Sequence, residues 1–358
     1  MAVLTLTRHE LEHEIRSGRL FDHEHFINCD FSNAHIGGGI FNECQFTQCT
    51  FDNARIEQSN FINCRFEQCR FPGSDWSEVN INDAALSNSD LSHSSFANTN
   101  FITSDMNGCN FSGGTFADTN FVQCQMSHTG FNQSSLPFIV FNECNLHSSS
   151  MRECHLERTA FLECDLSGIH FRDSFMQQVI FEKPDLSGQD FSGMHLALTQ
   201  FRHATLNQCN FSGSNLTQAA FTDASLQQCN FSGAEAQAAS FYAADLKGSQ
   251  LNKANLFQAS LQQSDLSACN ISNSQLGQAQ LAGCIMRNTI LQNSDLSYAD
   301  LSHTVCSHTD FSNTNLTHTN LHALIDDGAV WSGSNRSRAL PTDEKRLQAE
   351  RWKPQPVL

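Results

Sequence analysis

The sequence has no long apolar run. None of its 358 residues fall in a stretch of 18 apolar residues, so no transmembrane helix is expected. The first twenty residues have no basic start followed by an apolar core and a cleavage site of small residues, which a secretory signal requires. We therefore expect a cytoplasmic protein, and export without a signal stays an open alternative.

Positive charge is also scarce. The chain holds 20 Lys and Arg residues against 37 Asp and Glu residues, a formal net charge of −17. The imbalance lies in residues 1–246, which carry 28 acidic and 11 basic residues. An acidic surface repels the phosphates of nucleic acids and membranes, so we expect no direct contact with either.

The usual signals of catalysis are few. There is no phosphate-binding loop and no G-x-S-x-G nucleophile motif. The 15 cysteines include no C-x-x-C pair, the spacing typical of metal and redox sites. We expect no catalytic residue, no cofactor and no metal, and interpret the protein as not an enzyme.

A period of five residues takes the place of such motifs. Residues 196–231 read LALTQ FRHAT LNQCN FSGSN LTQAA FTDAS LQQCN F, in which every block opens with Leu or Phe. The residue two places before each of these is small. The same frame holds at all 61 positions from Phe21 to Leu321 whose numbers end in 1 or 6, with only Ala236 and Cys306 as weak members. A period of five belongs neither to an α-helix nor to a strand.

These blocks resemble the pentapeptide-repeat family, whose units approximate Ala-(Asp/Asn)-Leu-X-X. Matching units include Ala-Asp-Leu at 244–246, Ala-Asn-Leu at 254–256 and Cys-Asn-Phe at 209–211. The resemblance covers residues 21–325. It implies an all-β fold, a right-handed quadrilateral parallel β-helix with four units in each coil and roughly 15 coils.

In such a coil the large residue of each block and the small residue two places earlier should point inward. The predicted core is represented by Phe201, Leu206, Phe211, Leu216, Phe221, Leu226 and Phe231. Residues 20 apart should stack, so that two Phe columns, one through Phe101 and Phe121 and one through Phe111 and Phe131, face each other. Val179, Pro184, Gln189 and Met194 fit their small inward positions poorly and predict a distortion or bend at 179–194.

The same frame gives most polar candidates a structural role. Fourteen cysteines occupy the small inward position, where Cys serves as a compact hydrophobe. An Asp directly before the large residue suits the tight turn. A step of five residues reaches the next side of the coil, so His303, His308 and His318 should diverge.

Both ends should be capped. Residues 1–20 are predicted to form a helical cap over Arg8–Arg16, with Thr7 as N-cap and Glu10 completing a capping box. The register fails at Asp326, so residues 326–358 are predicted to be a C-terminal cap and tail. There, Trp331 or the pair Leu324 and Ile325 would plug the last coil. Thr342 would cap a short helix over 343–352, which Pro354 and Pro356 would end.

Six acidic residues lie at outward positions where the turn does not require an acid. They mark a candidate interaction surface: Glu143, Glu153, Glu157, Glu163, Asp173 and Glu182. The pattern predicts a non-enzymatic, rod-like scaffold for protein–protein interaction. Leu-Thr-Arg-His-Glu-Leu at 6–11, followed by Ile-Arg-Ser-Gly-Arg-Leu at 15–20, is similar to pentapeptide-repeat proteins associated with bacterial type VI secretion. This similarity implies an accessory or adaptor whose partner is a spike or effector protein.

Two other functions stay open. Some members of the family are acidic mimics of DNA that protect a type II topoisomerase, gyrase, and some are effectors delivered into a host cell. The oligomeric state is also open, with a dimer through a terminal cap among the alternatives.

Overall fold

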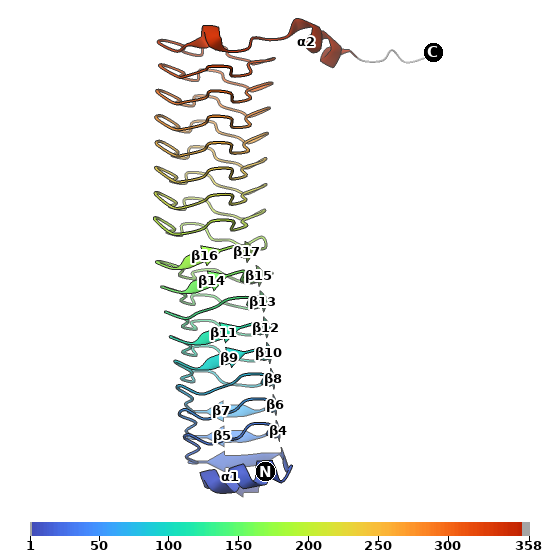
Figure 1. The fold of residues 1–358 in the computed structure, drawn as a ribbon. Coiled ribbons are helices and arrows are strands. Elements are labelled where there is room, and N and C mark those ends of the chain that lie inside the picture. The colour runs from blue at the N-terminus through green and yellow to red at the C-terminus, as the bar shows by residue number, and fades with distance from the viewer. Residues whose placement is uncertain (1, 353–358) are drawn as a thin grey trace, which may run out of the picture. The chain divides into compact units, whose positions relative to one another are not determined.

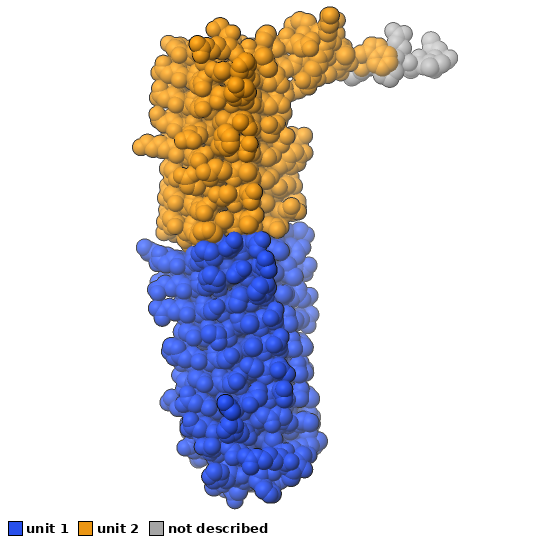
Figure 2. Space-filling view, in the orientation of Figure 1, with its two compact units in different colours: residues 1–185 blue, residues 186–358 orange. Residues whose placement is uncertain are grey.

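The computed structural model describes residues 2–352, which belong to two compact units, residues 1–185 and residues 186–358 (Figure 2). Pro354 and Pro356, which were expected to end the last helix, lie outside the described residues. Among residues 2–352 no helix is long and apolar enough to cross a membrane.

Unit 1 is a stack of short parallel strands (Figure 1). Nine strands, one every 20 residues, form its largest sheet in the order β17-β15-β13-β12-β10-β8-β6-β4-β2. Their bounds are β2 Leu20–Asp22, β4 Ile40–Asn42, β6 Asn60–Ile62, β8 Asn80–Asn82, β10 Asn100–Ile102, β12 Asn120–Val122, β13 Val140–Asn142, β15 Ala160–Leu162 and β17 Ile180–Phe181.

Smaller sheets form further sides of the same coils. One has the order β1-β3-β5-β7, and two-stranded sheets pair β9 with β11 and β14 with β16. Their strands are β1 Ala2–Leu4, β3 Glu24–Ile27, β5 Gln45–Thr47, β7 Arg65–Glu67, β9 Ser95–Ala97, β11 Thr115–Ala117, β14 His155–Glu157 and β16 Phe175–Gln177.

Unit 2 repeats the same backbone pattern through single parallel bridges instead of named strands. The bridges again join residues 20 apart, from Asp190 with Asn210 to Asn320 with Leu340. A 3-10 helix, η1 (Arg336–Arg338), and the helix α2 (Glu344–Arg351) follow. Both units therefore confirm the predicted quadrilateral parallel β-helix, in which four five-residue sides complete one coil.

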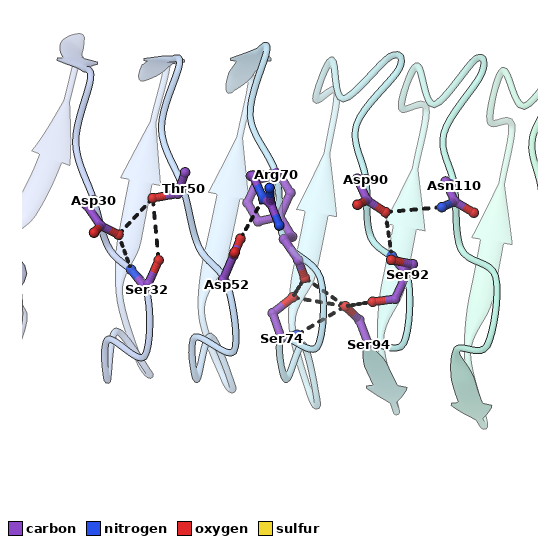
Figure 3. Close-up of polar contacts among 11 residues, drawn as sticks. Asp30, Ser32, Thr50, Asp52, Arg70, Ser74, Asp90, Ser92, Ser94 and Asn110 are labelled. Atoms are coloured by element: carbon purple, nitrogen blue, oxygen red, sulfur yellow. Dashed lines mark hydrogen bonds and ion pairs between the residues drawn. The ribbon is translucent and has the colours of Figure 1, made fainter.

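The five-residue period arises from the way each corner turns. The residue two places after each large inward residue takes a left-handed conformation, as at Asn98 (φ 54°) and Gly108 (φ 67°). Such a φ favours Gly and Asn. Directly before the large residue, Asp90 accepts a hydrogen bond from the Ser92 amide at 3.1 Å (Figure 3), which confirms the predicted turn role of Asp.

Stacked rings fill the core. Phe121 lies parallel to Phe101 and Phe141, with ring centroids 4.8 and 4.9 Å apart, and edge-on to Phe131 at 6.2 Å. The facing Phe columns are thus present in unit 1. In unit 2 the predicted core residues are all buried: Phe201, Leu206, Phe211, Leu216, Phe221, Leu226 and Phe231.

A helix, α1 (Arg8–Arg16), covers the first coil. Thr7 and Glu10 form the predicted capping box at its start. Glu12, 5% exposed, accepts a hydrogen bond from the His35 amide at 2.9 Å. Equivalent amides in later coils bond to the coil before them, as the Arg55 amide does to Ala34, so Glu12 replaces the missing neighbour. Strand β1, which extends the β3 edge, was not predicted from the sequence.

The C-terminal cap begins later than predicted. The backbone coil continues through Asp326, because Val330 still bridges to Asp310. Trp331 then stacks on Phe311, with ring centroids 4.1 Å apart, and the Arg336 guanidinium lies 4.2 Å from the Trp331 ring. Trp331 is therefore the plug, whereas Ile325 is about half exposed.

The predicted N-cap of the last helix is wrong by one residue. Asp343 caps α2 by accepting from the amides of Lys345 and Arg346 at 3.0 and 3.1 Å. The Thr342 hydroxyl instead accepts from the Ala323 amide at 3.2 Å, which ties the segment before α2 to the coil.

The coil at 179–194 is irregular in three respects. Strand β17 has only two residues, and the division between the compact units falls after Asp185. Gln189 is half-buried, whereas most residues at this small position are fully buried. A bend at this coil stays a prediction.

Replacing Phe121 by Ala should lower the free energy of unfolding by about 3–5 kcal/mol, because a cavity would interrupt the stacked column. Urea unfolding followed by circular dichroism measures the change. Phe138→Ala is the matched control, since Phe138 is 43% exposed, and it should cost at most about 1 kcal/mol. Equal losses for the two variants would contradict the stacked core.

Candidate interaction surface

The structure does not place the six candidate acids on one surface. They fall into separate columns of residues 20 apart: Glu143 with Glu163, Glu153 with Asp173, and Glu157 and Glu182 each in a column of its own. The first two columns are ten residues apart, which is half a coil. Only Glu143 with Glu163 and Glu153 with Asp173 are neighbours. A role of these acids in binding a partner stays a prediction.

A different surface stands out on unit 1. We call it the aliphatic–asparagine face: the 14 outward side chains of the seven strands β4, β6, β8, β10, β12, β13 and β15. Seven are aliphatic and seven are Asn, and none is charged. The members are Ile40, Asn42, Asn60, Ile62, Asn80, Asn82, Asn100, Ile102, Asn120, Val122, Val140, Asn142, Ala160 and Leu162.

Its aliphatic residues are accessible. Ile40, Ile62 and Ile102 are 44%, 36% and 38% exposed, and beyond the two ends Leu20 and Ile180 are also exposed, each followed two residues later by an acid, Asp22 and Glu182. The side of unit 1 half a coil away is charged instead. It carries Asp90 and the ion pair of Arg70 with Asp52 at 2.9 Å (Figure 3). The absence of charge is thus a property of one face.

Asparagines stiffen the middle of the aliphatic–asparagine face. The Asn80 amide donates to Asn60 at 3.1 Å, Asn100 donates to Asn80 at 3.1 Å, and Asn120 donates to Asn100 at 2.9 Å. Each link fixes one side chain against the next strand. Side chains that are already ordered would lose less entropy on binding than free ones.

Acidic residues line both edges of this face. The corner column on one edge holds Glu43, Asp83, Glu143 and Glu163, and the column on the other edge holds Glu78 and Asp118. We call these six residues the acidic rims. Between residues 43 and 163, Arg158 is the one basic residue in the two columns.

Sequence reasoning missed a motif on α1. His9-Glu10-Leu11-Glu12-His13 matches H-E-x-x-H, which places two zinc ligands and a general base on one side of a helix in metalloproteases. Here Glu10 is engaged in the capping box, where it accepts from the Thr7 amide at 2.8 Å. The carboxylate that would act as general base in such a motif is thus held at the start of the helix. Within residues 2–352, the one grouping of three metal-ligating side chains lies elsewhere.

That grouping joins His303, His322 and Glu350, whose ligand atoms lie within 4.8 Å of one another. His303 and His318 do not converge, as predicted, because His318 stacks on Tyr298 instead. His322 was overlooked: it lies one residue past the large position, and its partner Glu350 comes from α2.

Hydrogen bonds explain the grouping better than a metal does. Nδ1 of His322 accepts from the Asp343 amide at 3.1 Å, which places the ring proton on Nε2, facing Glu350 at 3.1 Å. A metal on Nε2 would move that proton to Nδ1, against the Asp343 amide. The grouping therefore docks α2 on the coil, as His303 also contacts Glu350 at 3.3 Å.

The cysteines are free thiols in the column positions that the register predicts. The Cys124 thiol lies 3.4 Å from the carbonyl oxygens of both Phe101 and Val122. Burial raises the pKa of Cys154 to about 12 and that of Cys109 to about 12. These thiols are therefore protonated at neutral pH and poor nucleophiles.

The five-residue repeats of this chain match two family models. The model described as a pentapeptide repeat region matches residues 21–96, 138–211 and 195–261. A second, described as pentapeptide repeats (8 copies), matches residues 94–133, 249–288 and 289–323. The chain belongs to the pentapeptide-repeat family. A pentapeptide-repeat coil is a repeat scaffold, and its variable surface lies on its outward side chains.

Solved structures similar to this pentapeptide-repeat chain include HetL from Nostoc sp. strain PCC 7120, involved in heterocyst differentiation regulation. HetL is 18% identical, with 70% of this chain and 90% of HetL covered and a TM-score of 0.31. A pentapeptide-repeat protein of the Arabidopsis thaliana thylakoid lumen is 30% identical over 33% of this chain and 68% of its own, with a TM-score of 0.23.

Another is full-length QnrB1, a plasmid-mediated fluoroquinolone resistance protein, 17% identical over 62% of this chain and 89% of its own, with a TM-score of 0.23. Among curated proteins, none matches this sequence.

The native thiols should resist modification. At pH 8, a thiol reagent whose absorbance changes when it reacts should label the folded protein far more slowly than the same protein in urea. In urea all 15 cysteines become accessible. Cys164, the one half-buried thiol, should react first. Rapid labelling of Cys154 in the folded protein would contradict its burial.

Replacing Glu350 by Ala should release α2, because Glu350 links this helix to both His303 and His322. Hydrogen exchange of residues 344–351 should become faster, while Gln348→Ala, an exposed change on the same helix, should leave it unaltered.

Acid should have the same effect as the Glu350 variant. Hydrogen bonds from His322 and Arg346 lower the pKa of Glu350. The docked state should therefore persist above the ordinary glutamate value of about 4.3 and be lost as the pH falls through the lowered pKa. Unchanged protection of residues 344–351 down to pH 2, measured relative to the intrinsic exchange rate at each pH, would rule out this docking.

Proposed function

We propose that this chain is a non-enzymatic scaffold that binds another protein through the aliphatic–asparagine face. The observation that carries the proposal is the neutrality of this face, on a unit with 24 acidic and 10 basic residues. Exposed aliphatic residues gathered on one surface mark interaction sites. Their repetition on strand after strand gives a partner a long, flat and ordered contact.

Packing supports a role on the outer surface. The inward columns of both units are filled by Phe, Leu and small residues, which leaves the outward side chains to recognise a ligand. A surface hollow of about 500 Å³ is lined by Gln258, Gln278, Gln280 and Tyr298, and none of these four side chains is a carboxylate, a histidine or a cysteine.

The finer assignment is an accessory or adaptor of a bacterial type VI secretion system. Its support is the N-terminal pattern at 6–11 and 15–20, which the structure folds into α1 and the start of β2. Leu20, the last residue of this pattern, continues the aliphatic series of the face. The expected partner is a spike or effector protein.

Co-purification tests both levels of the proposal. The chain and a spike or effector protein should elute together, and Ile62→Asn with Ile102→Asn should abolish the complex, because Asn already occupies seven equivalent positions without disturbing the fold. Glu153→Gln with Asp173→Asn, half a coil away, is the control and should bind normally. Failure to bind any spike or effector protein would exclude the secretion role.

A second candidate function is binding to a type II topoisomerase as a mimic of DNA. The observation that favours it is the column of Glu43, Asp83, Glu143 and Glu163, which repeats negative charge along unit 1. A supercoiling assay decides: purified protein in micromolar excess should alter gyrase activity, and no effect would remove this function.

A further inference from the structure

We infer that the partner segment received by the aliphatic–asparagine face is a basic amphipathic α-helix, with an aliphatic stripe between flanks of Lys or Arg. This inference rests on the proposed function and names the chemistry of the partner. Its basis is that the aliphatic–asparagine face carries no charge, whereas the acidic rims lie along both of its edges.

The width of the face suits one helix. In each coil, five residue steps that include a corner separate the two rims, as from Asn98 to Thr103, so the rims lie at most about 16 Å apart. A helix with its side chains is about 10–12 Å across, so this width admits one helix and excludes two side by side.

The length of the face suits a common helix. Seven strands spaced by about 4.8 Å extend over about 29 Å, the length of a helix of about 19 residues. Ile40 and Ile62 lie in the first half of this distance, Ile102 on the middle strand, and Val122, Val140 and Leu162 in the second half, so the aliphatic contact continues along the helix.

Three rim carboxylates accept hydrogen bonds from neutral groups and keep their charge for a positive partner, whereas Glu43 pairs with His23 at 2.8 Å. Asp83 accepts from the Thr103 hydroxyl at 2.5 Å, Glu143 from the Gln123 amide at 2.9 Å, and Glu78 from the Gln58 amide at 3.1 Å. All three donors are neutral. Lys or Arg residues on both flanks of a helix would pair with these carboxylates, and charge complementarity would also speed association.

Two other occupants fit less well. A second copy of the chain would bring its own acidic rims against these, and like charges repel. An anionic membrane would be repelled in the same way. The rims therefore favour a basic partner over both.

A synthetic peptide tests the inference with the full chain. The probe is a fluorescent 19-residue helix with Leu along one stripe and Lys on both flanks. A scrambled peptide of equal composition and a peptide with Glu in place of Lys are the controls. Fluorescence anisotropy should show saturable binding of the probe that weakens as salt rises, and little binding of either control.

Variants of the chain locate the site. Ile62→Asn with Ile102→Asn should weaken binding more than about 10-fold by removing two aliphatic contacts. Asp118→Asn with Glu143→Gln should weaken it about 3- to 10-fold and reduce its salt dependence. Glu153→Gln with Asp173→Asn removes the same charge half a coil away and should change it less than 2-fold. Circular dichroism checks that all variants fold.

Several results would overturn the inference: equal binding of the scrambled peptide, equal weakening by the Glu153 and Asp173 variant, or no binding at low salt. Self-association that Ile62→Asn with Ile102→Asn abolishes would place a second copy on the face and overturn it too. If the peptide fails while the same double variant still abolishes co-purification with a secretion protein, the proposed function stands and the helix does not.

Discussion

Backbone pairing between residues 20 apart is the constraint on which the rest of this structure depends. The Gln125 amide bonds back to Ser104 at 3.0 Å, and the Met126 amide bonds forward to Asn145 at 2.8 Å. Each side chain inside the coil therefore lies between the side chains of the residues 20 before it and 20 after it. Like therefore stacks on like, with Phe rings inside and Asn amides outside. Interior and surface follow from one register.

Because that register is visible as a five-residue period in the sequence, the residues that point into the core could be predicted from it. The large and small inward positions, the Phe columns and the turn role of Asp required only counting in fives, and the capping box required the spacing of Thr7 and Glu10. The elements missed were those without a period. Strand β1 has three residues, and the coil persists beyond Asp326 because backbone pairing tolerates a polar residue in an inward position.

The candidate surface was harder to predict. Exposed acids were singled out one by one along the sequence. Glu143 and Glu153, which are ten residues apart, lie on sides separated by half a coil. Recognising the aliphatic–asparagine face requires the sequence to be arranged in rows of 20, so that Ile40, Asn60 and Asn80 stand in one column. The docking of α2 could not be predicted, since Glu350 and His322 are brought together only by the path of the chain after the last coil.

The left-handed corners have a consequence for how such a protein changes over generations. Each corner closes within its own five residues, so a duplication or deletion of 20 residues returns the chain to the same side with all columns aligned. The gene can therefore gain or lose whole coils by recombination without repacking the interior. A binding stripe on one side would lengthen or shorten in steps of one strand, and its reach would be set by copy number as well as by point substitution.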